Sequence, residues 1–216
     1  MNYRIDHDRE TRIGFPEVIY GETKDVTTLL NILEEIFKHH EKALITKLQQ
    51  EKTAEIKKKY VNVFFDHKSG ICIVGKILKN RKKNPDVVIL SGGTSDEFVV
   101  NEAFYTAEFL GLKAQKFIDV GVAGVHRLFE KKEEISKSKV IIVCAGFEGA
   151  LPTVVGGLFP QPIIGIPVSV GYGVAKGGHT ALNSMLSSCA NGLLVTNIDN
   201  GYGAAIAAYR IVKGLK

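Results

Sequence analysis

The second part of the chain alternates short apolar runs with amphipathic stretches, and this alternation restricts the possible folds more than any other feature. The apolar runs are residues 87–90, 114–119, 140–144, 163–168 and 193–198. The helical patterns that follow them are residues 97–110, 125–134, 149–158, 176–188 and 202–213. Short continuous apolar runs are typical of strands that are buried on both faces. The alternation therefore predicts a parallel sheet with right-handed crossovers.

We expect a three-layer α/β/α domain whose five parallel strands follow the order 2-1-3-4-5. Ligands of such domains bind outside the carboxyl ends of the strands. The polar residues that follow each predicted strand are therefore the first candidates for a functional site.

The first 84 residues have a different pattern and predict a small α+β region, which leaves residues 85–216 as the main domain. Residues 1–24 are mostly polar, which is typical of a solvated arm. Residues 25–59 show a helical pattern that weakens after His39 and His40. Residues 60–77 contain two β-rich runs around a turn and predict a hairpin outside the main sheet. Residues 79–85 are polar and basic and indicate a linker.

Composition argues against several classes of function. The net charge of +5 is mild and no basic stripe alternates with aromatics, so we expect no nucleic-acid partner. No apolar run approaches the about 18 residues of a membrane span, and because residues 1–10 are polar and charged we expect no signal peptide. Cys72, Cys144 and Cys189 show no paired spacing, which favours reduced thiols in a cytoplasmic protein. The adjacent His39 and His40 point in different directions on a helix, so they make a poor pair of metal ligands, and we expect no metal among the site residues.

A glycine-rich loop follows the first predicted strand and opens a helix. Gly93 allows the backbone to approach a phosphate closely, and the helix N-terminus supplies N–H donors. Thr94, Ser95 and Asp96 add polar side chains, although the same residues could merely cap the helix.

His126 and Arg127 follow the second predicted strand. The guanidinium of Arg127 suits a phosphate or a carboxylate, and His126 suits proton transfer. A structural role for His126 is the alternative.

Further candidates follow the third, fourth and fifth strands. Glu148, beside Gly146, is the only carboxylate in an apolar turn, where it could act as a base, orient water or anchor a substrate. It could also be a simple acid at a helix N-terminus. Lys176 is the cation of a glycine-rich loop, and Asn197 and Asp199 are polar residues at the end of the last strand.

Cys189 lies in the polar turn 187–192, which follows the fourth helical pattern. A cysteine usually packs in the core, and we expect this of Cys72 and Cys144, which lie in apolar runs. A polar turn is a less usual place for a packing cysteine. Cys189 is therefore the candidate nucleophile.

Several motifs in combination resemble the LarB family, the pyridinium-3,5-biscarboxylic acid mononucleotide synthases of nickel-pincer cofactor biosynthesis. They are GGTSD, DVGVAGVHR, AGFEGALP, SVGYG-x-x-x-GG, NSMLSSCA and NIDNGYGAA, preceded from Asp6 to Lys24 by D-x-x-R-x-x-R-x-G-F-P-E-V-I-Y-G-x-x-K. The domain from Asp86 onward also resembles PurE, the aminoimidazole ribonucleotide carboxylase or mutase, with its flavodoxin-like strand order. Glu148, Cys189 and the N-terminal region depart from PurE and favour LarB.

The resemblance implies that nicotinic acid adenine dinucleotide is carboxylated by CO2 at pyridinium C5 and hydrolysed at its phosphoanhydride, which releases AMP. It implies a covalent adduct of Cys189 at C6. The other catalytic candidates that it implies are Asp96, His126 and Glu148. The substrate-binding candidates are Gly93, Thr94, Ser95, Arg127, Gly146, Lys176, Asn197 and Asp199. It makes no resident cofactor certain, CO2 being a substrate and Mg²⁺ a candidate for the hydrolytic step. It also implies a homo-oligomer of the octameric PurE type.

Two other functions stay open at this point. One is a PurE-like carboxylase or mutase that acts on aminoimidazole ribonucleotide. The other is a nucleotide-binding module without catalytic activity.

Overall fold

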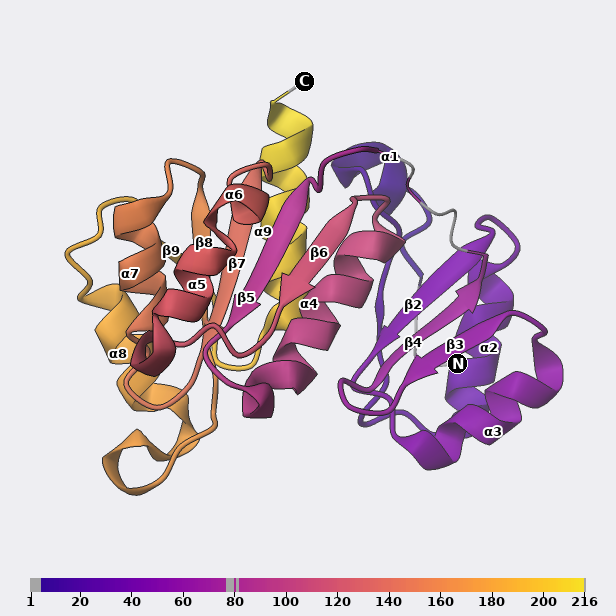
Figure 1. The fold of residues 1–216 in the computed structure, drawn as a ribbon. Coiled ribbons are helices and arrows are strands. Elements are labelled where there is room, and N and C mark those ends of the chain that lie inside the picture. Colours follow the sequence, from indigo (N-terminus) through magenta and orange to yellow (C-terminus); the bar gives the residue numbers. More distant parts are fainter. Residues whose placement is uncertain (1–4, 77–79, 81, 216) are drawn as a thin grey trace. The chain divides into compact units, whose positions relative to one another are not determined.

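The structure is a computed structural model that describes residues 5–76, 80 and 82–215 (Figure 1). Contacts divide the chain into two units, Met1–Leu78 and Lys79–Lys216. Each unit has its own sheet and apolar core. None of the described helices is both long and apolar enough to cross a membrane.

The second unit confirms the predicted parallel α/β domain. Its strands are β5 (Val87–Ser91), β6 (Ala114–Phe117), β7 (Val140–Ala145), β8 (Ile163–Pro167) and β9 (Leu194–Val195). They form one sheet in the order β6-β5-β7-β8-β9, and each neighbouring pair is parallel. Numbered along the chain, this is the predicted order 2-1-3-4-5.

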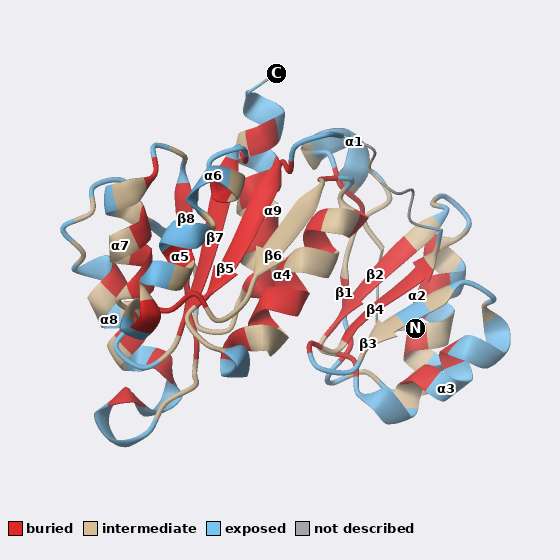
Figure 2. Ribbon diagram, viewed as in Figure 1, coloured by how far each residue is buried: buried red, intermediate tan, exposed pale blue. Residues whose placement is uncertain are grey.

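The helices of the second unit cover both faces of this sheet. They are α4 (Glu97–Phe109), α5 (His126–Glu130), α6 (Lys132–Ile135), α7 (Leu151–Leu158), α8 (His179–Leu186) and α9 (Gly201–Gly214), with short 3-10 turns η1 (Thr94–Asp96), η2 (Val122–Gly124) and η3 (Gly173–Gly178). Alternate residues of β5 and β7, such as Val88 and Ile141, pack in one core with residues of α5, α6, α7 and α8. In Figure 1, α5 and α7 lie in front of the sheet and α9 lies behind it. Both β5 and β7 are buried along their whole length (Figure 2).

Two elements of this unit are shorter in the structure than the sequence predicted. The helix predicted at residues 125–134 is the pair α5 and α6, because Lys131 leaves the helical conformation at φ −97° and ψ 0°. The last predicted strand shortens to the two residues of β9, at the edge of the sheet. An edge strand has one partner only, so fewer backbone bonds define its length.

The first unit is the expected small α+β region. Its elements are α1 (Arg9–Ile13), β1 (Ile19–Tyr20), α2 (Val26–Ile36), β2 (Lys42–Thr46), α3 (Gln50–Lys59), β3 (Val63–Asp66) and β4 (Ile71–Gly75). The sheet order is β1-β2-β4-β3. The predicted hairpin is confirmed as the antiparallel pair β3 and β4, although residue 77, at its predicted end, lies outside the described residues.

Two expectations for this unit were wrong. Residues 25–59 are not one helical stretch, because β2 separates α2 from α3 and pairs with β4 at Leu44 and Ile73. Residues 1–24 are not simply a solvated arm, because Phe15 and Ile19 are buried and β1 pairs with β2. In both cases pairing with distant residues decides the local structure, and the local pattern does not show it.

Candidate functional site

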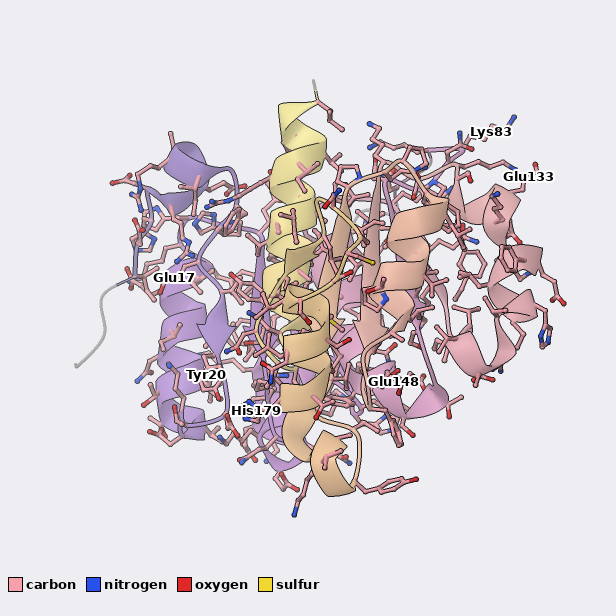
Figure 3. All side chains as sticks on the ribbon, turned by 90° about the vertical axis from the view of Figure 1, so that its left-hand side faces the viewer. Glu17, Tyr20, Lys83, Glu133, Glu148 and His179 are labelled. Atoms are coloured by element: carbon pink, nitrogen blue, oxygen red, sulfur yellow. The ribbon has the colours of Figure 1, made fainter. Side chains whose placement is uncertain are left out.

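A pocket of about 280 Å³ lies beyond the carboxyl ends of the central strands. It is lined by residues of the loops after β5, β6, β7 and β8. Six predicted site residues line it: Gly93, Ser95, Asp96, Arg127, Gly146 and Glu148. Figure 3 labels Glu148, together with His179 from the start of α8. The pocket is where the fold predicts that a ligand binds.

Glycines bring the loops of this pocket close together. A side chain on Gly121 would collide with the carbonyl oxygen of Gly92, and one on Gly146 would collide with the carbonyl oxygen of Val170. The backbone therefore forms much of the pocket wall. Such walls can offer N–H groups to an anionic ligand at short range.

Asp96 is the buried acid of the pocket, with 4% of its surface exposed. Its Oδ2 accepts a hydrogen bond from the backbone N–H of Gly93 at 3.0 Å. Burial raises the pKa of Asp96 to about 6, the N–H groups of Gly93 and Gly92 oppose this rise, and the charge of Asp199 adds to it. A carboxyl group with a pKa close to neutrality can accept and release a proton under working conditions.

Arg127 is held at the pocket wall by two partners. Its Nη1 forms an ion pair with Asp119 Oδ2, and its Nε donates to the carbonyl oxygen of Gly124 at 3.4 Å. Asp119 reaches this position from a left-handed backbone conformation at φ 65°. A guanidinium has five N–H donors in a planar fork, so Arg127 keeps donors for an anionic ligand.

Phe147 presents an aromatic ring at the pocket. It is 43% exposed, and its backbone N–H donates to the carbonyl oxygen of Val170 at 2.9 Å. Its ring meets that of Tyr172 edge to face at 5.5 Å between centroids, and Tyr172 is 77% exposed. Exposed aromatic rings at a pocket can stack on a heteroaromatic ligand. The pocket thus combines hydrogen-bond donors, a cation, carboxyl groups and an aromatic ring.

Comparison with known families identifies both units of the chain. Residues 2–76 match the LarB/PurE-like N-terminal domain, and residues 86–215 match AIR carboxylase. The chain belongs to the LarB family. The family that the sequence motifs indicated is therefore confirmed. The second unit of this LarB-family protein is PurE-like.

One relative matches almost the whole chain. It is the uncharacterized protein MJ0165 of Methanocaldococcus jannaschii, which is 39% identical over 217 residues. The match covers 97% of this chain and 84% of the relative. The LarB and AIR carboxylase matches together indicate an enzyme of the carboxylase or mutase type.

The other predicted site residues of this LarB-family chain do not line the pocket. Thr94, His126, Lys176 and Asn197 are exposed. Asp199 lies close enough to Asp96 to influence its pKa, and its Oδ1 accepts a hydrogen bond from the backbone N–H of Ser169 at 2.9 Å. Asp199 therefore ties the loop after β9 to the loop after β8, beside the pocket.

Cys189, in the LarB motif NSMLSSCA, is exposed and does not line the pocket either. Its neighbours lie along α7: Ser188 Oγ is 2.7 Å from Thr153 Oγ1, and a Cβ on Gly156 would lie 2.7 Å from that of Ala190. Of α7, only the first turn lines the pocket, through Ala150 and Leu151. The contacts near Cys189 are made farther along this helix. Within one described chain, Cys189 and the pocket are not brought together.

The other two cysteines are buried, as expected. Burial raises the pKa of Cys72 to about 12, with Lys57 opposing the rise. Burial also raises the pKa of Cys144 well above its usual value, and the carboxylates of Asp96, Glu102 and Asp199 add to this. Neither of these two thiols can ionise readily, whereas Cys189 is exposed and open to reaction.

Sequence reasoning did not select Asp119, Phe147 and Tyr172 as site residues. Asp119 ends a predicted strand, and the left-handed turn that directs it toward Arg127 has no local signal in the sequence. Phe147 and Tyr172 did carry a signal, because each is an aromatic residue in a glycine-rich loop after a buried strand. Such residues have no core to fill, and a ligand is one reason for them.

Proposed function

We propose that this LarB-family protein carboxylates the pyridinium ring of nicotinic acid adenine dinucleotide with CO2 and hydrolyses its phosphoanhydride. The products are pyridinium-3,5-biscarboxylic acid mononucleotide and AMP. One observation carries the proposal: a LarB-type N-terminal unit precedes an AIR carboxylase-like domain, whose pocket has a cation, carboxyl groups and an aromatic ring.

The pocket suits the chemical groups of this substrate. The dinucleotide has a pyrophosphate, and the glycine-rich loops and Arg127 supply hydrogen-bond donors and positive charge for it. The ring of Phe147 offers a stacking surface for a heteroaromatic ring. Glu148 and Asp96 supply oxygen ligands of the kind that Mg²⁺ prefers, should the hydrolytic step need this ion.

The carboxylation step needs a nucleophile because pyridinium C5 is electron-poor and does not attack CO2. We assign this role to Cys189. Its thiolate forms a bond to C6, and the ring becomes a dihydropyridine whose C5 is enamine-like. C5 then forms a bond to the carbon of CO2, which becomes a carboxylate. Loss of the C5 proton to a base and expulsion of the thiolate restore the aromatic ring, and sulfur is well suited to both roles.

The base for the C5 proton is expected among the pocket carboxyl groups. Asp96, with its pKa raised to about 6 chiefly by burial, can accept a proton and release it again near neutral pH. Glu148 is exposed at the mouth of the pocket and can orient the water molecule that cleaves the phosphoanhydride. That water adds its oxygen to one phosphorus and gives up a proton, while the bond from this phosphorus to the bridging oxygen breaks, so that AMP and the mononucleotide separate.

Cys189 lies outside the pocket, in a segment whose neighbouring residues contact α7. This position supports a site shared between copies of the chain. Cys189 is exposed, so it is accessible to a second molecule. We therefore propose a homo-oligomer, of the octameric PurE type, in which Cys189 of one copy completes the pocket of another. This arrangement would supply the sulfur that the described pocket lacks.

A second candidate is a PurE-like reaction on aminoimidazole ribonucleotide. It is favoured by the match of residues 86–215 to AIR carboxylase. That reaction needs no thiol addition, so the two functions differ in their dependence on Cys189.

The test is a product assay with each substrate. The protein is incubated with bicarbonate and either nicotinic acid adenine dinucleotide or aminoimidazole ribonucleotide, and the products are analysed by mass spectrometry. We expect AMP and a dicarboxylated mononucleotide from the dinucleotide only. Carboxylation of aminoimidazole ribonucleotide alone would establish the second candidate, and no product from either substrate would contradict both.

A further inference from the structure

We propose that His7, Glu35 and His39 form a binding site for a borderline divalent transition metal of the Zn²⁺ class in the N-terminal unit. Each of the three residues offers one ligand atom, and these atoms all lie within 4.8 Å of one another. All three residues belong to the first unit, and none of them is among the residues that we assign to the carboxylation chemistry. It therefore stands independently of the proposed function.

The spacing of the ligand atoms fits a single metal ion. His7 Nε2 and Glu35 Oε1 are 3.5 Å apart. Two tetrahedral ligands with bonds of about 2.0–2.2 Å to zinc lie roughly 3.3–3.6 Å from each other. The imidazoles of His7 and His39 are close neighbours, with ring centroids 4.1 Å apart and a tilt of 48°.

His7 also has an unused donor atom. Its Nδ1 is buried and has no hydrogen-bond partner among residues 5–76, 80 and 82–215. A buried imidazole nitrogen is normally paired, since leaving it unpaired is unfavourable. His7 thus keeps a nitrogen lone pair that a cation can take, whichever ring nitrogen carries the proton.

Local structure explains how the three residues meet. Glu35 lies in the last turn of α2, and His39 follows four residues later, where its backbone N–H bonds to the carbonyl oxygen of Ile36 at 3.0 Å. Residues four apart lie on the same side of a helical turn. The leader supplies His7, and its neighbour Asp6 is fixed by a 2.7 Å hydrogen bond from the backbone N–H to Glu17 Oε2.

The second oxygen of Glu35 is already oriented. Lys38 Nζ binds Glu35 Oε2 at 2.6 Å, and Oε1 is the oxygen that faces His7. Ligating carboxylates in metal sites are commonly held by such outer partners. A set of two imidazoles and one carboxylate suits zinc and its neighbours in the first transition series, whereas Mg²⁺ and Ca²⁺ prefer oxygen ligands only. Three protein ligands leave a fourth position for water.

His40 does not belong to this cluster. Its Nδ1 is 3.1 Å from Glu10 Oε2. The expectation that the adjacent histidines point in different directions therefore agrees with the structure. The partner of His39 is His7, which is 32 positions away and which no local spacing could indicate.

The test is zinc titration of the untagged full-length protein after removal of metals with a chelator. It is done in a Cys189→Ser background, so that the exposed thiol cannot bind the metal. We expect one zinc ion per chain by calorimetry. His7→Ala and His39→Ala should each weaken binding by more than about tenfold, as should Glu35→Gln, which keeps the shape of the side chain.

His40→Ala is the matched control and should bind zinc as the parent does. Circular dichroism checks that each variant is folded. With Co²⁺ in place of Zn²⁺, the visible absorbance of a four-coordinate site should appear in the parent and in His40→Ala only. Absence of saturable binding to the parent would overturn the proposal, as would binding that the His7, His39 and Glu35 variants leave within about twofold of the parent.

Discussion

The three cysteines differ in exposure, and their reactivity should differ accordingly. At neutral pH, iodoacetamide should alkylate Cys189 in the folded protein, whereas burial and raised pKa values protect Cys72 and Cys144. Mass spectrometry should show one modification in the wild type and none in Cys189→Ala. In urea the wild type should take up label at all three thiols. Modification of Cys72 or Cys144 in the folded protein would contradict these burial assignments.

Asp96 should make stability depend on pH in a specific direction. Its pKa is raised to about 6 in the folded state, chiefly by burial, against about 3.9 in an unfolded chain. The folded state therefore holds this proton more tightly, so its contribution is fully present below about pH 4 and is lost as pH rises through 6. In the wild type this lowers the free energy of unfolding by at most about 3 kcal/mol as the pH rises. Urea unfolding of Asp96→Asn should not show this decrease. If the free energy of unfolding changed with pH in the same way in the wild type and the variant, Asp96 would not be a buried acid with a raised pKa.

Arg127→Ala should weaken dinucleotide binding more than it slows the chemical step. A guanidinium that binds phosphate acts in the ground state and the transition state alike, so KM should rise by about 10–100-fold with little change in kcat. Steady-state kinetics measure both constants. A collapsed kcat with unchanged KM would assign Arg127 to the chemistry instead.

At the scale of elements, the packing of α7 against the segment that carries Cys189 can be tested with two adjacent glycines. A Cβ on Gly156 would lie 2.7 Å from that of Ala190, whereas one on Gly157 would meet nothing within 4 Å. Gly156→Ala should destabilise the protein by about 1–3 kcal/mol through overpacking. Gly157→Ala, as the matched control, should stabilise it by about 0.5–1 kcal/mol, because alanine favours a helix. Thermal unfolding reports both effects, and equal changes would contradict the contact.

The elements also show what local pattern can and cannot predict. The strands β5, β7 and β8 are buried on both faces, so their apolar runs and the sheet order were predictable. The strand β2 was missed because its pairing at Leu44 and Ile73 joins residues far apart in the chain. The position of Cys189 was not predictable, because it depends on where the segment after α8 packs against α7. Six of the predicted site residues line the pocket because parallel strands bring their carboxyl ends to one edge, whereas Phe147, which also lines it, was missed.

At the scale of the whole molecule, the described chain separates the two parts that the proposed reaction needs. The pocket has the binding groups and the carboxyl groups, whereas Cys189 lies outside it, in the segment that packs against α7. A homo-oligomer that brings Cys189 of one copy to the pocket of another would unite them. Light scattering should therefore show an oligomer at working concentration.

The most direct test of this account is to mix two inactive variants. Cys189→Ala removes the sulfur, and Arg127→Ala combined with Glu148→Ala damages the pocket, so each protein alone should form almost no dicarboxylated mononucleotide. If a site is built from two copies, dissociating the two variants and assembling them together should restore activity, because some sites receive an intact pocket from one copy and an intact Cys189 from the other. The account predicts recovery of a substantial fraction of wild-type product. Mixed oligomers, confirmed by native mass spectrometry, that stay inactive while wild type treated in the same way is active would contradict it.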